Sequence, residues 1–367
     1  MSKLILLLCV FTLASAKPLH YGVRSLGLGG AMTSVSNDQN ALYENPAGLA
    51  SLPTWDVDFL TLGVMASTND QALATTIQKQ VAALGGSFSS LSPANINFSE
   101  FIYEVSAKPY SLGVFWNPYF VKKNFGMAFD AVGDIELTLH GLNDEFIDAS
   151  ARFVTDSRFA VAQSYFNNRL DVGWAFAFKT QHSVIQSFST DSVVQYANQP
   201  DTLKNLLAAG WALDLNTGVI LRPWENWSPS IGIDVNHIFN TYYFPLVQKI
   251  GGSPNPTPPT EPQSFNIGFS LEPKSGHWFL LGALDFKDIN LPTLPSQKFS
   301  LGLESGWKTL YQKYAFQVGF SEGSYTAGTE LRFPLFSFRF ATYALQKGYY
   351  TDQLVDRKYV LQIKIII

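Results

Sequence analysis

The chain of 367 residues has almost no cysteine, which excludes several kinds of site. Its single cysteine, Cys9, lies in an N-terminal segment, Met1–Ala16, that we predict to be a secretory signal peptide. Lys3 precedes the apolar run Leu4–Leu13, and the small residues Ala14-Ser15-Ala16 end the segment, so cleavage is predicted after Ala16. The mature chain would then lack cysteine, which excludes disulfides, thiolate metal sites and a catalytic thiol.

Charged residues and long apolar runs are also scarce. Charged residues make up 15% of the chain and aromatic residues 14%, whereas about a quarter of an average soluble domain is charged. The net charge of −4 gives no reason to expect a nucleic-acid partner. After the signal peptide, no apolar run reaches the roughly 20 residues that a membrane-spanning helix needs. A chain of this kind can cross a bilayer only as a closed barrel.

Motifs for catalysis, metal binding or nucleotide binding are missing from the sequence. It has no Gly-x-Ser-x-Gly elbow, His-Glu-x-x-His pair or phosphate loop, and Gly27-x-Gly29-Gly30 does not match the dinucleotide fingerprint. The histidines, at positions 20, 140, 182, 237 and 277, are scattered. We therefore predict no enzymatic activity, no cofactor and no metal site.

What the sequence does contain is repeated alternation of large apolar residues with small or polar ones. Leu170, Val172, Trp174 and Phe176, for example, alternate with Asp171, Gly173 and Ala175. A soluble β-sandwich would bury the large residues, whereas a membrane barrel would turn them toward lipid. Many segments reach about nine to eleven residues, the span of a tilted transmembrane strand, which favours the barrel. Inward-facing acids would then form a solvated network with Lys179 or Arg339, anchoring a plug; they are Asp130, Asp134, Glu136, Asp171, Asp214 and Asp234.

A glycine-dense stretch, SLGLGGAMTSVSNDQNALYENPAGL, lies between the signal peptide and the first strand. Glycines at 27, 29 and 30 allow tight folding and close backbone contact, and Asn45-Pro46-Ala47-Gly48 is turn chemistry. Ser25–Leu49 therefore reads as a plug. The stretch resembles the N-terminal signature of FadL/TodX-type outer-membrane transporters and of their PorV-like and TraF-like relatives. In that family such a segment forms a hatch inside a fourteen-stranded barrel.

Together, pattern and resemblance imply an all-β fold: a transmembrane antiparallel β-barrel of about 14 strands. We expect a signal peptide at 1–16, a lumenal hatch at 17–55 and the barrel at 56–367, with short helices in external loops. The hatch motif would comprise Gly27, Gly29, Gly30, Asn45, Pro46, Ala47 and Gly48. Alternating loop lengths place the short turns and the C-terminus on the periplasmic side.

Fifteen segments read as strands, at 56–66, 98–107, 110–119, 125–139, 152–165, 169–182, 211–222, 229–240, 264–272, 277–287, 298–306, 314–321, 324–331, 335–344 and 357–367. An odd number cannot close with both termini in the periplasm. We favour residues 110–139 as one strand kinked at Asn117-Pro118, since proline removes a ladder hydrogen bond. Such a kink resembles the wall opening of FadL-type transporters. The alternative is an external hairpin there, with residues 56–66 inside the barrel.

Two predicted external helices, Gln71–Leu84 and Thr202–Ala209, have helical spacing of apolar residues. They could form a ligand-capture rim or merely cover the contacts of their own loops. The rim residues would be Ile77, Val81, Leu84, Leu206 and Leu207. Aromatic residues near strand ends would form interfacial girdles; examples are Trp116, Tyr119, Trp211, Trp224, Trp227, Trp278, Trp307, Tyr311 and Tyr314.

The resemblance implies a function at the outer membrane of a Gram-negative-type bacterium, reached after signal-peptide cleavage. One reading is passive uptake of hydrophobic small molecules, such as long-chain fatty acids. The alternative is a PorV-like surface protein that binds or shuttles secreted protein substrates without transporting small molecules. Expected partners are outer-membrane lipid, a hydrophobic ligand and the barrel-assembly machinery, with no nucleic acid, and the chain is expected to be a monomer.

Overall fold

The computed structural model describes residues 22–52, 55–83, 108–139, 146–189, 207–224, 227–246, 256–309, 312–346 and 355–365. The predicted signal peptide and the strand-like segment 98–107 lie outside the described residues. In the part of the chain that is described, no helix has the length and apolar character to cross a membrane.

Short helical elements precede and interrupt a long series of strands. The helices are α2 (Val23–Gly27), η1 (Gln39–Leu42), η2 (Pro46–Ser51), α3 (Asp70–Ala83) and α7 (Pro295–Lys298). The strands are β1 (Asp56–Asp58), β2 (Thr61–Ser67), β3 (Lys108–Trp116), β4 (Tyr119–Lys122), β5 (Phe125–Leu139), β6 (Phe146–Tyr165), β7 (Leu170–Ser189), β8 (Ala208–Leu221), β9 (Ser230–Asn236), β10 (Phe244–Pro245), β11 (Ser264–Leu271), β12 (Lys274–Ser275), β13 (Trp278–Phe286), β14 (Phe299–Lys308), β15 (Lys313–Ser321), β16 (Ser324–Arg332), β17 (Phe336–Gln346) and β18 (Val355–Ile365).

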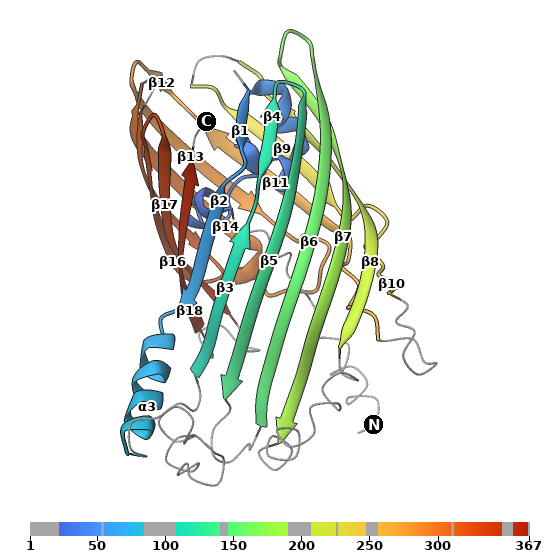
Figure 1. Ribbon diagram of the computed structural model, residues 1–367. Coiled ribbons are helices and arrows are strands. Elements are labelled where there is room, and N and C mark those ends of the chain that lie inside the picture. The colour runs from blue at the N-terminus through green and yellow to red at the C-terminus, as the bar shows by residue number, and fades with distance from the viewer. Residues whose placement is uncertain are drawn as a thin grey trace.

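The chain forms a closed antiparallel barrel (Figure 1), which has fourteen strands. Eighteen segments are paired, but the short β1, β4, β10 and β12 are the interrupted ends of longer barrel strands. This leaves fourteen barrel strands. Closure comes from β18, whose residues Lys358–Lys364 pair with Thr61–Ser67 of β2. The predicted barrel is therefore confirmed.

The two faces of the barrel wall have opposite chemistry. Apolar side chains on the outer face are exposed, such as Met127 at 48% and Phe176 at 52%, while Asp130 and Asp171 on the inner face are 4% and 0% exposed. The six inward acids predicted from the sequence all lie on this inner face, although Glu136 is only half-buried. An apolar outside around a polar inside is the arrangement of a barrel that spans lipid.

Connections differ in length between the two ends of the barrel. One end carries short turns, at 123–124, 166–169, 222–229, 272–277, 309–312 and 333–335. The opposite end carries longer connections, apart from the two-residue turn 322–323, and it carries α3, which lies at the lower end in Figure 1. Short turns at one end and longer connections at the other are typical of bacterial membrane barrels.

The prediction of one kinked strand over residues 110–139 is wrong. Residues 108–122 and 125–139 are two antiparallel strands, with Lys122 paired to Phe125 across a tight turn at Lys123-Asn124. Asn124 has a φ of 70°, the left-handed conformation that asparagine tolerates better than most residues. The alternative is also wrong, because the hairpin lies at the end with short turns and residues 61–67 belong to the wall.

A bend does exist at Asn117-Pro118, within the first strand of this hairpin. Leu62 pairs with Trp116 and Asp58 pairs with Tyr119, so three residues, Phe59 to Thr61, stand opposite two. This is a β-bulge, which bends a strand and increases its twist. The bulge leaves both Phe59 and Leu60 on the outer face, 58% and 47% exposed.

A second bulge interrupts the barrel strand formed by β9 and β10. Thr217 of β8 pairs with Val235, and Trp211 of β8 pairs with Phe244. Between these two pairs, five residues of β8 face eight residues of the bulged strand. The bulge, at 237–240, contains His237 and Asn240, both with positive φ. His237 is buried on the lumenal side, while Phe239 is 73% exposed on the outer side.

Two smaller expectations are also corrected. Ala208 and Ala209 begin β8, so the predicted helix 202–209 does not extend to them; strand pairing with His182 and Ser183 fixes their extended conformation. Tyr119 does not join an aromatic girdle, because it points into the barrel and is 5% exposed. The predicted helix at 71–84 corresponds to α3.

Residues 22–52, called the hatch from here on, lie inside the barrel (Figure 1). Leu42, Leu49 and Leu52 pack with Tyr119 and Val121 of β4. Leu28, Ala31, Met32 and Val35 form a second cluster with Leu281 and Ala283 of β13. The apolar core of the protein is thus formed between the hatch and the inner face of the wall.

Candidate functional site: a lumenal cavity beside the hatch

Glycines of the hatch motif allow its backbone to touch the wall. Gly29 and Gly30 have φ values of 65° and 80°, which other residues adopt with strain. A Cβ at Gly29 would lie 2.7 Å from the carbonyl oxygen of Phe320. Gly27, in α2, accepts a hydrogen bond on its carbonyl from Thr326 Oγ1 at 2.9 Å.

The Asn45-Pro46-Ala47-Gly48 corner forms the start of η2 and is fully buried. Asn45 Oδ1 accepts a hydrogen bond from the Ala47 N–H, and its Nδ2 donates to the Thr33 carbonyl at 2.7 Å. Pro46 at the first helical position needs no N–H donor, as is common at helix starts. A Cβ at Gly48 would lie 1.6 Å from the Ser36 carbonyl oxygen, so only glycine fits there.

One buried ion pair ties the start of the hatch to the wall. Arg24 donates to Glu304 of β14 through Nε at 3.0 Å and Nη2 at 2.6 Å, and its Nη1 donates to Asp38 at 3.0 Å. Burial disfavours the charged guanidinium, but the carboxylates of Glu304 and Asp38 outweigh it and raise the pKa of Arg24. Bidentate pairing of this kind fixes orientation as well as charge.

Backbone amides and a lysine make a second attachment. Asp285 of β13 accepts hydrogen bonds from the N–H groups of Met32 and Thr33, both at 2.8 Å. Lys287, just beyond β13, donates to Glu44 of the hatch at 3.0 Å, and Ser25 donates to the other oxygen of Glu44. The hatch is therefore bound to the wall on its charged side as well as through its apolar core.

Tyr43 and Arg158 make a third attachment. The Tyr43 hydroxyl donates to Asp130 of β5 at 2.9 Å, and Arg158 of β6 donates to the Leu42 carbonyl at 3.1 Å. The Arg158 guanidinium also lies 4.7 Å from the centre of the Tyr43 ring. Burial and the charge of Asp130 raise the pKa of Tyr43 well above its ordinary value, so it remains a hydrogen-bond donor.

Glycines in the barrel wall leave room for the hatch to approach the wall closely, a feature that sequence reasoning missed. A Cβ added to any of them would come within 3.2 Å of a hatch atom: to Pro46 C at 2.4 Å for Gly173, to Asn45 Oδ1 at 2.0 Å for Gly218, and to the Thr33 carbonyl at 2.2 Å for Gly232. A Cβ would come equally close to the hatch on other barrel strands, at Gly126, Gly268, Gly302, Gly319 and Gly328. Glycine inside a strand often marks close approach of another backbone, which is the signal that could have found them.

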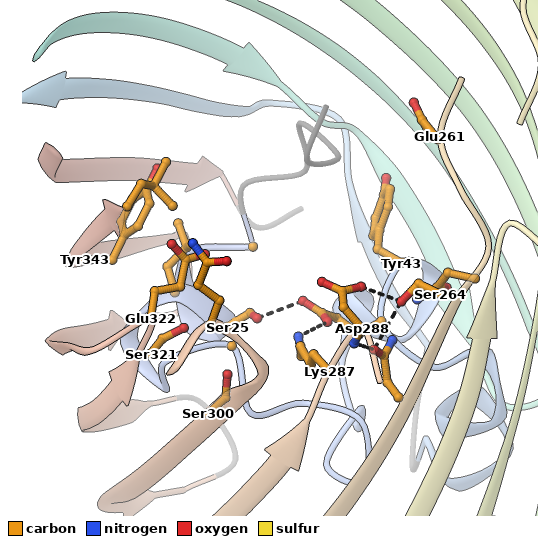
Figure 2. A pocket seen from close by; sticks show the side chains of 18 of the residues that line it. Ser25, Tyr43, Glu261, Ser264, Lys287, Asp288, Ser300, Ser321, Glu322 and Tyr343 are labelled. Carbon is orange, nitrogen blue, oxygen red and sulfur yellow. Dashed lines mark hydrogen bonds and ion pairs between the residues drawn. The ribbon is translucent and has the colours of Figure 1, made fainter. Parts of the chain in front are cut away.

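Beside the hatch, toward the end with long loops, the lumen contains a cavity of about 520 Å³. Figure 2 shows Tyr343, Glu322 and Ser321 on one side of it, and Tyr43, Ser264 and Glu261 on another. An apolar corner is formed by Leu26, Val132, Tyr343 and Leu345. The rest of the lining mixes small, polar and apolar residues with charged ones: acids Glu44, Asp130, Glu136, Asp156, Glu261, Asp288 and Glu322 and bases Arg152, Arg158, Lys179, Lys287 and Lys358.

A buried cluster at the second bulge has the residue types of a metal site. Asp214, His237 and Glu261 offer ligand atoms within 4.8 Å of one another. However, Lys179 Nζ lies 2.6 Å from Glu261 and 3.1 Å from Asp214, so its ammonium already provides the positive charge between the two carboxylates. The Thr241 hydroxyl also donates to Asp214, and the Tyr243 hydroxyl donates to Glu261. This arrangement fits an ion-pair network that fastens the bulge better than it fits a metal.

The described residues of the predicted ligand-capture rim belong to segments at the end with long loops. Ile77 and Val81 belong to α3 at the end with long loops, and Leu207 is half-buried just before β8. Leu84 and Leu206 lie outside the described residues. Asn117 is buried at the first bulge, where its N–H donates to the Thr61 carbonyl, and Pro118 accepts a hydrogen bond from Phe129.

In sequence, the chain matches no protein-family model and no curated protein. In structure, it is similar to the CymD monoaromatic hydrocarbon channel, with 12% identity and a TM-score of 0.53 over 93% of this chain and 95% of CymD. It is also similar to a ΔS2S3 mutant of the TodX monoaromatic hydrocarbon channel, with 11% identity and a TM-score of 0.52 over 94% of this chain and 97% of that one. The chain therefore shares the barrel fold of these two channels.

Proposed function

We propose that this protein is an outer-membrane barrel for the passive uptake of hydrophobic small molecules. The observation that carries the proposal is the cavity of about 520 Å³ with an apolar corner, which lies in the lumen beside the hatch. Similarity to proteins described as monoaromatic hydrocarbon channels supports the same class of ligand. A location in the outer membrane of a Gram-negative-type bacterium is part of this proposal.

The route begins at the end with long loops. External segments such as α3 would take up the ligand, and the corner formed by Leu26, Val132, Tyr343 and Leu345 would bind its apolar part. Burial of apolar ligand surface supplies the driving force, about 0.8 kcal/mol for each methylene group. Release toward the periplasm would require a rearrangement of the hatch, which lies on the other side of the cavity.

Equilibrium dialysis of the protein in lipid nanodiscs tests the proposal, with empty nanodiscs measuring partition into lipid. Radiolabelled butyltoluene represents the alkylbenzenes and oleate the long-chain fatty acids, and saturable binding of at least one is expected. Leu345→Trp should weaken this binding because it fills the corner, whereas Leu303→Trp, on the outer face where Leu303 is 48% exposed, should not. A lack of saturable binding would favour a PorV-like role in holding secreted proteins at the cell surface.

A further inference from the structure

An arginine lies on the outer face of the barrel, near the end with longer connections. Arg357 belongs to the first turn-proximal residues of β18, and its neighbours Asp356 and Lys358 are buried on the inner face, so the alternation of the strand turns Arg357 outward. The next outward residues, from Tyr359 to Ile365, are exposed and mostly apolar, and they span about 20 Å of strand. The apolar band of a membrane barrel is about 25 Å tall. Arg357 therefore lies at the border of this band, at the depth of lipid headgroups.

The side chain of Arg357 is held in place by the two strands beside it. Arg357 pairs with the small residue Ala344 of β17, and beyond it the guanidinium lies 3.7 Å from the centre of the Tyr325 ring of β16. Its Nη1 donates to the Tyr325 carbonyl at 3.2 Å and to the Thr342 hydroxyl at 3.4 Å. The strands β16, β17 and β18 are neighbours in the sheet (Figure 1). Because a guanidinium stacks on aromatic rings, Tyr325 fixes the plane of the Arg357 side chain before any ligand binds.

The charge of Arg357 is not offset within the protein. In the described part of the chain, no carboxylate forms an ion pair with it, and neither Nε nor Nη2 has a hydrogen-bond acceptor. Arginines on the inner face differ, since Arg158 lies 2.7 Å from Asp156 and Arg339 lies 2.9 Å from Glu330. Nε and Nη2 form one edge of the guanidinium, and this edge matches two oxygens of a phosphate or carboxylate. Arg357 thus offers an open edge for an anion at headgroup depth.

We propose that Arg357 binds the phosphate group of an anionic membrane lipid in the leaflet at the end with longer connections. The proposal goes beyond the uptake function and depends only on the transmembrane barrel. Nε and Nη2 donate to two phosphate oxygens, as arginine does in bidentate phosphate pairs. The acyl chains extend along the outer face next to Leu361 and to Phe340, whose ring stacks on Tyr359 at 5.9 Å between ring centres. Basic residues at a membrane surface attract anionic lipids in preference to zwitterionic ones.

Native mass spectrometry of the detergent-solubilised protein tests the proposal, with dioleoyl phosphatidic acid and dioleoyl phosphatidylcholine as probes. The two lipids have the same acyl chains and differ only in the headgroup. We expect saturable binding of phosphatidic acid, at least about fivefold tighter than binding of phosphatidylcholine, which is the effect of one arginine at a membrane surface. Glycerol 3-phosphate has the phosphate without the chains, and it should bind far more weakly because the contacts with the outer face are missing.

Three substitutions on the outer face locate the site. Arg357→Gln should lower the affinity for phosphatidic acid about fivefold, to that for phosphatidylcholine. As a matched control, Lys122→Gln removes an exposed base at the opposite end of the barrel, where Lys122 Nζ lies 5.6 Å from the centre of the Phe125 ring, and should leave the affinity unchanged. Tyr325→Leu keeps the arginine but removes the ring that orients it, and should lower the affinity about threefold. Heat-modifiable migration shows that each variant has folded.

The outcomes are distinct from those that test uptake. Equal affinity of the wild-type protein for the two lipids would overturn the proposal, and so would equal losses in Arg357→Gln and Lys122→Gln, because the charge would then act without a site. Binding of glycerol 3-phosphate as tight as that of phosphatidic acid would show a site for free phosphate instead. Butyltoluene binding should be the same in Arg357→Gln as in the wild-type protein, since Arg357 lies outside the lumen, so the uptake function stands or fails independently.

Discussion

Replacing Gly218 by alanine should loosen the hatch. The new Cβ would lie 2.0 Å from Asn45 Oδ1 and 2.7 Å from its Cγ, whereas carbon contacts are most favourable at about 3.5 Å. Asn45 cannot retreat freely, because its Nδ2 donates to the Thr33 carbonyl at 2.7 Å and the corner is buried. The Asn-Pro corner must therefore move by about 1.5 Å, and overpacking of this kind costs about 1–3 kcal/mol.

That cost should appear as more frequent opening of the hatch, by about 5- to 150-fold. A reporter cysteine at Ala50, which is 1% exposed, measures the opening through its rate of reaction with a maleimide. The protein produced from Lys17 onward lacks Cys9, the single cysteine of the sequence, so the label is specific. Gly133→Ala is the matched control, because a Cβ there would find its nearest neighbour at 3.8 Å. Equal labelling rates in the two variants would refute the idea that wall glycines seat the hatch.

Two further predictions concern the ion pairs and the outer face. Glu304→Gln removes the wall carboxylate from the Arg24 guanidinium and leaves Asp38 as its charged partner, and should lower the free energy of unfolding in urea by about 3 kcal/mol. The control Glu272→Gln, which removes a charge just after β11 at one end of the barrel, should lower the free energy of unfolding far less. An equal effect of the two substitutions would argue against the anchoring role of Arg24. Phe176→Lys places a charge on the outer face, where Phe176 is 52% exposed. In lipid this should cost about 2–4 kcal/mol, measured as loss of the heat-modifiable folded band; an unaffected band would contradict a lipid-facing position.

Strand positions were predictable because alternation is a local signal. Residues 170–179, for example, alternate between large apolar residues and small or charged ones, and all lie within β7. Each inward acid could be assigned from the same alternation, since a strand turns successive side chains to opposite faces. The hatch motif was also recognisable, because its glycines and its Asn-Pro corner have specific conformational requirements that a sequence displays.

Features that depend on pairing between distant residues could not be read in this way. The first bulge is defined by register, with Phe59–Thr61 opposite Asn117-Pro118, and register is invisible in either segment alone. Pro118 suggested a bend within one strand, but the chain reverses direction at Lys123-Asn124. Residues 110–139 therefore form two strands. The partners of the hatch are equally distant: Arg24 and Glu304 are 280 positions apart.

Tyr119 and Ala208 failed for another reason, namely that residue type alone was a poor guide. An aromatic residue near a strand end is common in girdles, yet Tyr119 faces inward, where its hydroxyl donates to Asp56. Alanine favours helices, yet Ala208 and Ala209 extend β8, because pairing with β7 outweighs the weak intrinsic preference.

Single-channel conductance in planar bilayers tests most directly whether residues 22–52 close the lumen of a transmembrane barrel. The wild-type protein should conduct little, and a variant lacking residues 25–48 should conduct as an open pore, with heat-modifiable migration showing that its barrel has folded. A folded deletion variant with the conductance of the wild-type protein would contradict the account.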